Sequence, residues 1–231
     1  MKLFENHTAL VFFSRTAAEE TSCKKLLSGS TKLNYKVVEA LIQRSQKVAE
    51  KSGLPLFIFS EDQQKGSSFG ERLSASVQSV FDKGFDKLII IGNDCPQLTS
   101  KNIKEAAFKL KTFNQVIAPT RKGGAYLIGL TQKSFNKDAF TTIRWQSNFA
   151  CNDLKKLFSF SVFLLPLRDD VNNISDLRKQ VFCLQKADTL RIYLISIIAS
   201  ITKYFAGIAC LKTPFSKRFS FGLKAPPVLV S

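Results

Sequence analysis

The chain has 231 residues, 45% of them hydrophobic and 23% charged, which is enough for one sizeable α/β domain with an appendage. Its 34 lysines and arginines outnumber 18 aspartates and glutamates, and the net charge of +16 fits either an anionic partner or a merely basic surface. The five cysteines form no CxxC pair and His7 is the only histidine, which argues against zinc or disulfide frameworks, serine–histidine chemistry and His-rich metal sites.

Apolar runs alternate with amphipathic segments along the first 187 residues. The patterns predict strands at 8–14, 54–60, 87–91, 115–120, 125–130 and 159–167. They predict helices at 33–50, 69–84, 101–111, 149–158 and 173–185. The polar stretch 15–31 is predicted to be a loop. Such an alternation indicates a mostly parallel sheet that is covered by helices on both faces.

The composition changes at about residue 188, so we expect one domain over 1–187 and an apolar, basic helical tail over 188–231. The first half of the tail is apolar nearly all round. It could pack on the domain or on a partner subunit, lie in a membrane interface through residues 190–218, or span a bilayer. A span would place Lys203 near mid-depth, at a cost of about 2.5–3.5 kcal/mol. In the interfacial alternative the basic residues meet anionic lipids: Lys203, Lys212, Lys217 and Arg218.

The start of the chain shows no signal peptide, because Glu5 and His7 interrupt its apolar residues. Together with the scattered cysteines, this favours a cytoplasmic protein with reduced thiols. For His7, which precedes a strand, a structural role is expected. No motif that mixes aromatic and basic residues supports nucleic-acid binding.

Acidic residues follow two of the predicted strands. Asp94 comes just after 87–91, where ligands of parallel α/β sheets bind, and its carboxylate could hold Mg²⁺ or Mn²⁺. The alternative is a helix cap, although Thr99 and Ser100 already serve as caps there. A second acidic turn follows the last strand and would reach the same rim, or would form only a turn and an N-cap: Asp169, Asp170, Asn172 and Asp176.

Several basic groups could bind phosphates at this rim. They are Arg15, Lys24 and Lys25 after the first strand, Arg72 at a helix start, and Arg121 and Lys122 beside the flexible pair Gly123 and Gly124. For each of them a solvated surface position is the alternative. Trp145, the only tryptophan, could stack on a base or a sugar, or pack in the core.

Five stretches together resemble the bacterial glycosyltransferase-like family A. They are "FGERL" (69–73), "LIIIGNDCPQLT" (88–99), "APTRKGGAYLIGL" (118–130), "IRWQS" (143–147) and "LPLRDDVNNISDL" (165–177). The resemblance covers about residues 8–180 and does not extend to the tail. It implies a GT-A fold, similar to nucleotide-diphospho-sugar transferases, with a three-layer sandwich and a mostly parallel sheet.

The resemblance also implies roles for individual residues. The family's Gly-Ser-Asp-x-Pro is matched by "GNDCP", so Asp94 stands in for the catalytic ligand of the metal and diphosphate, shared with Asp170. The nucleotide is expected to contact Lys24, Lys25, Arg72, Gly123, Gly124 and Trp145.

Departures from the family pattern are concentrated in two loops. The first loop lacks the family's proline and glycine, with Cys23 and Lys25 in place of a lysine and an arginine. The family's Glu-Asp-Gly-Gly has become Arg121-Lys122-Gly123-Gly124, which exchanges two acids for two bases. A lysine is no bidentate phosphate clamp, so these changes bear on catalysis more than on fold.

The resemblance therefore predicts a metal-dependent transferase that uses a nucleotide-diphospho-sugar donor, with Mg²⁺ or Mn²⁺ as cofactor. One alternative is a nucleotidyltransferase that acts on a nucleoside triphosphate. The other is a catalytically degenerate relative that serves in binding or assembly. Further partners expected are a second copy of the chain, or a membrane surface met by the tail.

Overall fold

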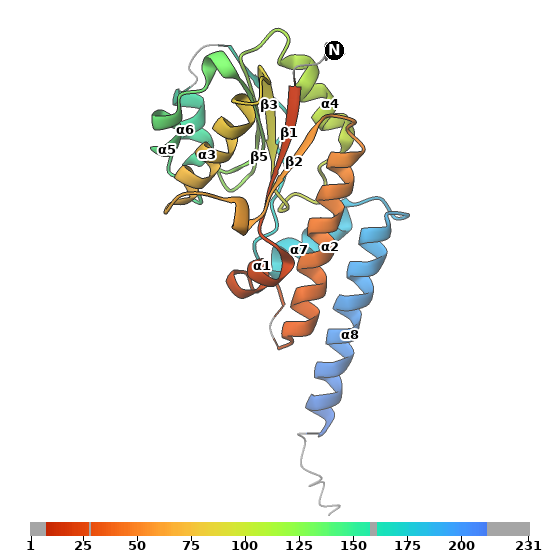
Figure 1. Ribbon diagram of the computed structural model, residues 1–231. Coiled ribbons are helices and arrows are strands. Elements are labelled where there is room, and N and C mark those ends of the chain that lie inside the picture. The colour runs from red at the N-terminus through yellow and green to blue at the C-terminus, as the bar shows by residue number, and fades with distance from the viewer. Residues whose placement is uncertain (1–7, 28, 158–160, 212–231) are drawn as a thin grey trace, which may run out of the picture.

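A six-stranded sheet forms the centre of the computed structural model, which describes residues 8–27, 29–157 and 161–211, with side chains up to residue 200 (Figure 1). The strands are β1 (Thr8–Phe13), β2 (Leu56–Phe59), β3 (Lys87–Ile91), β4 (Gln115–Pro119), β5 (Ala125–Thr131) and β6 (Val162–Leu164). The helices are α1 (Ala17–Cys23), α2 (Thr31–Glu50), α3 (Phe69–Phe81), α4 (Ser100–Lys109), α5 (Lys137–Thr141), α6 (Ala150–Leu157), α7 (Ile174–Cys183) and α8 (Thr189–Leu211). Two short 3₁₀ turns complete the elements, η1 (Glu61–Gln63) and η2 (Gln132–Ser134).

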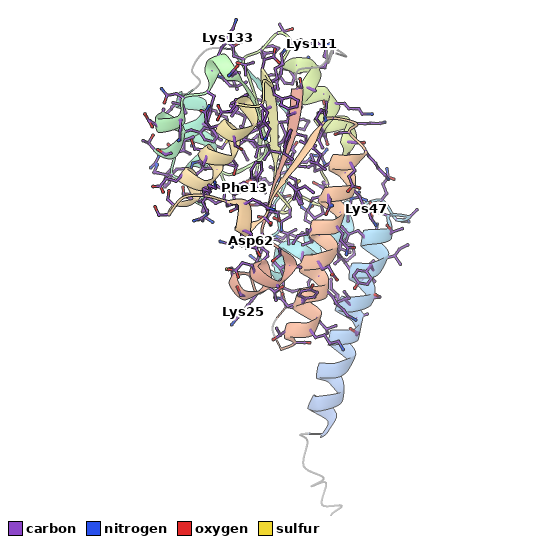
Figure 2. The ribbon with its side chains drawn as sticks, in the orientation of Figure 1. Phe13, Lys25, Lys47, Asp62, Lys111 and Lys133 are labelled. Carbon is purple, nitrogen blue, oxygen red and sulfur yellow. The ribbon has the colours of Figure 1, made fainter. Side chains whose placement is uncertain are left out.

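The strand order is β2-β1-β3-β5-β4-β6, and β5 alone among these six strands runs antiparallel to its neighbours. All six predicted strands are present, and the mostly parallel α/β fold is confirmed. Because β1, β2, β3, β4 and β6 point the same way, their carboxyl ends share one rim. Figure 2 places Phe13, the last residue of β1, at the lower end of the sheet, with Lys111 and Lys133 at the opposite end.

Helices cover both faces of the sheet, as the sequence predicts. Alternate residues of β1 enter different cores, since successive side chains of a strand point to opposite faces. Val11 packs with α3, α5 and α6, whereas Leu10 packs with α4 and the end of α2. Both of these side chains are fully buried. Figure 1 shows the resulting three layers, with α3, α5 and α6 on one side of the sheet and α2 and α4 on the other.

A third apolar cluster lies beyond the carboxyl rim, where α2 extends past the sheet. Its walls are α2, α7 and the first part of α8, and its members include Val37, Leu41, Leu177, Leu190 and Leu194. Figure 1 shows α8 running alongside α2. The helix predicted in the tail is therefore present, and its first half packs on the rest of the chain. No helix within the described residues has both the length and the apolar character to cross a membrane.

Some predicted elements fall partly outside the described residues. The strand expected at 159–167 is observed as Val162–Leu164, and residues 158–160 are not described. The same holds for residues 1–7, which include His7, and for Lys212, Lys217 and Arg218 of the tail, while the side chain of Lys203 is not described. The interfacial role of these basic residues stays a prediction.

The prediction of a loop over 15–31 is wrong in part, because α1 occupies Ala17–Cys23. None of its residues is buried, so the sequence carries no apolar stripe that would reveal it. A capping signal was nevertheless present. The Thr16 side chain accepts a hydrogen bond from the Glu19 backbone, which matches the Thr-x-x-Glu pattern of a helix start. The short helix α5 was also missed.

Candidate functional site

A cleft of about 610 Å³ opens at the rim where the parallel strands end. One part of it is apolar and lined by Phe13, Ile90 and Phe69. The other part is charged. Four cationic side chains and three carboxylates line it: Arg15, Lys24, Arg72 and Lys122, against Glu20, Asp94 and Asp170. These residues come from the segments after β1, β3, β4 and β6 and from α1 and α3, so the fold gathers them from distant parts of the chain.

Asp94 lies at this rim, three residues past the end of β3, with its side chain 45% exposed. It does not cap the next helix, because the Thr99 side chain caps α4 in a reciprocal arrangement with Asn102. The backbone carbonyl of Asp94 accepts a hydrogen bond of 2.8 Å from the Val171 amide. The first acidic position and the second acidic turn are therefore neighbours, as expected from their places after parallel strands.

The partner of the Asp94 carboxylate is the ammonium group of Lys24, which donates to Asp94 Oδ1. The same ammonium lies 3.9 Å from Glu20 Oε1, and only 13% of the Lys24 side chain is exposed. Burial and the nearby charge of Asp94 raise the pKa of Glu20, while Lys24 and Arg15 act in the opposite direction. The charged end of the cleft thus holds a cation that belongs to the chain itself.

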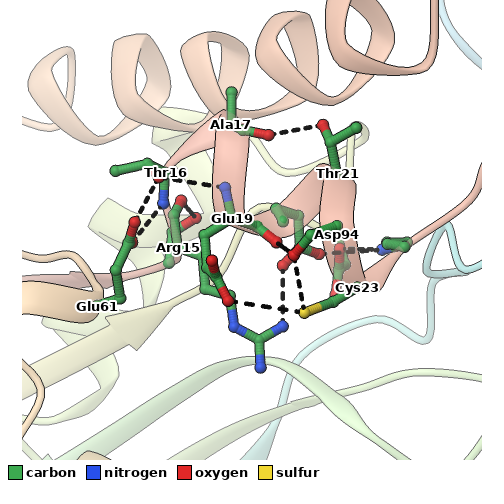
Figure 3. A network of polar contacts seen from close by, with 12 residues as sticks. Arg15, Thr16, Ala17, Glu19, Thr21, Cys23, Glu61 and Asp94 are labelled. Carbon is green, nitrogen blue, oxygen red and sulfur yellow. Dashed lines mark hydrogen bonds and ion pairs between the residues drawn. The ribbon is translucent and has the colours of Figure 1, made fainter. Parts of the chain in front are cut away.

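Segments around α1 hold Lys24 in place. Thr16, which precedes α1, donates to the Glu61 carboxylate through its backbone amide at 2.6 Å and also through its hydroxyl (Figure 3). At the other end of α1, the Lys24 amide closes the helix on the Glu20 carbonyl, and the Lys24 carbonyl accepts from the buried Asn34 side chain at 2.9 Å. The backbone from which Lys24 projects is therefore fixed at both ends.

The carboxylates of the second acidic turn have different roles, one of them structural and one in the wall of the cleft. Asp176 forms the capping box of α7 with Asn173, and its Oδ2 also accepts from Lys122 Nζ at 2.5 Å. Burial alone would raise the pKa of Asp176, but the hydrogen bonds from Lys122 and the Asn172 backbone outweigh it and lower the pKa. Asp176 therefore serves the turn and cap that the sequence offered as an alternative.

Asp170 is different, because it lines the cleft. Its Oδ2 accepts from the Asn172 side chain at 2.9 Å, while its Oδ1 is buried and has no hydrogen-bond partner among the described residues. Buried carboxylate oxygens normally accept hydrogen bonds. This oxygen is therefore a buried acceptor whose hydrogen bond the described residues do not supply.

Of the remaining residues expected to contact the nucleotide, some line the cleft and others do not. Arg72 lines the cleft but donates to the Ser67 carbonyl at 3.0 Å. Lys25 is exposed and does not line the cleft. Trp145 lines it, and also donates from its indole nitrogen to the Phe140 carbonyl at 2.9 Å. Trp145 thus combines the two roles, core packing and cleft wall, that the sequence left open.

The glycine pair also splits. Gly124 borders the cleft, whereas Gly123 does not line it and borders a second hollow beside α6. Gly123 has a φ of +83°, and a Cβ at that position would meet backbone atoms of Asn148. Its carbonyl accepts from the Cys151 amide at 2.8 Å. Gly123 therefore joins the 120–124 turn to the loop before α6, and its role as observed is to position that loop.

The predicted ion between Asp94 and Asp170 does not fit the side chains in this arrangement. Mg²⁺ and Mn²⁺ need carboxylate oxygens that are free to bind. Here an ammonium group already contacts Asp94, and the part of the chain that the structure describes holds no group of three or more His, Cys, Asp or Glu side chains suited to a metal. A requirement for Mg²⁺ or Mn²⁺ stays a prediction.

Sequence reasoning missed Glu20, Phe13 and Phe69 as cleft residues. Glu20 lies on α1, the helix that the sequence did not reveal. The two phenylalanines read as ordinary core residues, and they do pack together with ring centroids 5.5 Å apart. No local signal distinguishes a core aromatic residue from one that also borders a cleft.

Comparison with known proteins agrees with the fold. Residues 37–147 match the family described as "Uncharacterized protein conserved in bacteria (DUF2064)". The matched segment is just under half of the chain. The family match includes Asp94, Lys122 and Trp145, but not Lys24 or Asp170. No curated protein matches the sequence.

Among solved structures, a proposed nucleotide-diphospho-sugar transferase from Desulfovibrio desulfuricans G20 has a TM-score of 0.75 at 21% identity. The match covers 86% of this chain and 98% of that one. It shows that this chain has the nucleotide-diphospho-sugar transferase fold, which confirms the fold class, and together with the family match it bears out the resemblance.

Two weaker likenesses carry no argument. Rv0371C of Mycobacterium tuberculosis H37Rv, in complex with manganese, has a TM-score of 0.44 at 11% identity, covering 77% of this chain and 98% of that one. A cytidylyltransferase from Leptospira borgpetersenii has a TM-score of 0.44 at 12% identity, covering 87% of this chain and 95% of that one.

Proposed function

We propose that the protein is a transferase that binds a nucleotide-diphospho-sugar in the cleft at the carboxyl rim of the sheet. The observation that carries the proposal is the charged lining of this cleft, which includes four cationic side chains and the carboxylates of Glu20, Asp94 and Asp170. In α/β sheets ligands bind beyond the carboxyl ends of the strands, and cationic side chains there stabilise the charge of a leaving diphosphate.

The two ends of the cleft suit the two parts of such a donor. The diphosphate would lie against Arg15, Lys24 and Lys122. The Asp170 carboxylate lines the same cleft and could accept a hydrogen bond from a ribose or sugar hydroxyl, which a carboxylate does well. Phe69 and Trp145 supply apolar surface for a base or for an acceptor.

Calorimetric titration of the purified protein with a panel of nucleotide sugars and nucleoside triphosphates tests this proposal. Each titration is run once with EDTA and once with MnCl₂, which also tests the predicted need for a metal. A nucleotide sugar should bind and be consumed, and Asp94→Ala should lower turnover because Asp94 would no longer hold the Lys24 ammonium in place. Consumption of a triphosphate would instead support nucleotidyl transfer.

The degenerate alternative has its own outcome in the same experiment. The ion pair of Lys24 with Asp94 favours it, because the ammonium group occupies a carboxylate oxygen that a metal ion would need. Binding of a nucleotide sugar without turnover, for any acceptor tested, would support a binding role. Absence of binding by every nucleotide in both buffers would reject the transferase proposal.

A further inference from the structure

We propose that the Lys24 ammonium takes the place of a divalent cation at Asp94, so that the protein binds a diphosphate group without metal. This inference rests on the proposed function, since it specifies how the same cleft would hold the diphosphate. It starts from the position of Lys24, whose ammonium contacts Asp94 and lies 3.9 Å from Glu20. A cation that two carboxylates hold at the rim of a cleft is in the position from which a bound metal ion would meet a phosphate.

The Lys24 side chain is ordered before any ligand arrives. Only 13% of it is exposed, and its backbone is fixed by the Glu20 carbonyl and the Asn34 side chain. Asn34 in turn accepts from the amides of Leu26 at 2.8 Å and Leu27 at 3.0 Å. Because the side chain is already held, a ligand that meets the ammonium loses little further conformational freedom there.

The ammonium also keeps a route to the ligand. It carries three N–H donors, and Asp94 and Glu20 lie near it as acceptors. The Glu20 side chain is 12% exposed, whereas that of Asp94 is 45% exposed, and all three residues line the cleft. The cluster is therefore closed on the Glu20 side and open on the Asp94 side, where a phosphate oxygen could approach.

The charges of the cleft lead to the same conclusion. Its four cationic side chains outnumber its three carboxylates, so the lining is net positive without any metal. A divalent ion at Asp94 would have to displace the ammonium or lie beside it, against direct repulsion between like charges. In the other acidic turn, the Asp176 carboxylate is taken by Lys122 and by the amides of Asn172 and Asn173, so that turn offers the cleft only the carboxylate of Asp170.

Calorimetry with defined probes tests the inference. The probes are inorganic pyrophosphate and the diphosphates ADP, GDP, CDP and UDP, titrated into the full chain with EDTA or with MnCl₂. We expect the tightest probe to bind with the same Kd in both buffers, within about threefold. Lys24→Met should weaken binding in EDTA by about tenfold or more, as expected for loss of a charge-assisted hydrogen bond. In this variant MnCl₂ should recover much of the binding, because Asp94 becomes free to hold the ion.

Lys36→Met is the matched control, since Lys36 is exposed on α2 and does not line the cleft. It removes the same charge from the chain and should leave Kd unchanged. Circular dichroism of both variants shows whether the fold is kept, and Lys24→Arg, which keeps the charge, should retain binding in EDTA better than Lys24→Met does.

Three results would overturn the inference, and they separate it from the proposed function. Wild-type binding that requires MnCl₂ would reject the role of Lys24 and leave the transferase proposal standing. Equal binding of the wild type and Lys24→Met in EDTA would do the same. No binding of any probe in either buffer would reject both.

Discussion

Replacing Gly123 by alanine tests the assignment of this residue as a structural junction of the cleft. Gly123 has a φ of +83°, which L side chains rarely adopt. A Cβ there would lie 2.6 Å from the carbonyl carbon of Asn148 and 2.8 Å from its Cα, and closer still to its carbonyl oxygen. These are backbone atoms, so no side chain can rotate away. The hydrogen bond from the Cys151 amide ties the two segments together and limits their separation.

The expected loss of stability has two parts. The left-handed conformation costs alanine about 1–2 kcal/mol relative to glycine. Overpacking against the Asn148 backbone adds about 1–3 kcal/mol. Gly123→Ala should therefore lower the free energy of unfolding by about 2–5 kcal/mol. For a chain of this length, each kcal/mol lowers Tm by about 2–4 °C.

Gly84→Ala is the control that separates the two parts. Gly84 has a φ of +91°, but a Cβ added there meets nothing within 4 Å, so only the conformational cost applies. Urea denaturation followed by circular dichroism measures both variants. Gly123→Ala should be less stable than Gly84→Ala by the overpacking part alone. Equal stabilities would show that the 120–124 turn and the 145–150 loop do not meet as described, and would refute the reasoning.

Two further predictions concern a buried thiol and the tail helix. Burial raises the pKa of Cys95 to about 12, so at neutral pH its thiol stays protonated, and iodoacetamide should label the exposed Cys23 and spare Cys95, as read by peptide mass spectrometry. Equal labelling would contradict the burial. Leu194 is fully buried on α8, and Leu194→Ala should destabilise the docking of this helix by about 2–5 kcal/mol. Ile195→Ala, at a side chain 42% exposed, should cost far less, and limited proteolysis of the tail compares the two. Equal cleavage rates would show that α8 is not held through Leu194.

Strands and large helices were predictable because burial leaves a periodic trace in the sequence. The run at 88–91 is continuous and apolar because both faces of β3 are covered, and the strand is found at Lys87–Ile91. The helix α1 left no such trace, since it buries none of its residues. Its only signal was the Thr16 cap, which is short and easily read as a loop.

Pairings between distant residues could not be predicted. Lys24 and Asp94 are 70 positions apart, and their contact depends on α1, which was not expected, and on the neighbouring positions of β1 and β3 in the sheet. The sequence did place both residues at the rim. Because both residues follow parallel strands, the sequence predicts that they lie at the same edge of the sheet. It does not predict that the Lys24 ammonium pairs with the Asp94 carboxylate.

The buried face of the tail helix could not be predicted from the sequence either. Its first half is apolar nearly all round, so no stripe indicates which face would be buried. In the structure, α8 buries the side chains of Leu190, Leu194 and Ile197, which follow helical spacing, and leaves those of Ile192 and Ile195 exposed. These three side chains are buried because they pack against apolar side chains of α2 and α7, which lie beyond the sheet and would otherwise face water. Because the segment just before α7 supplies Asp170, and Asp176 in the first turn of α7 accepts the Lys122 contact, packing of α8 on α7 supports one wall of the cleft. A loss of α8 docking should therefore loosen that wall as well as the tail, which links the stability of this helix to ligand binding in the proposed site.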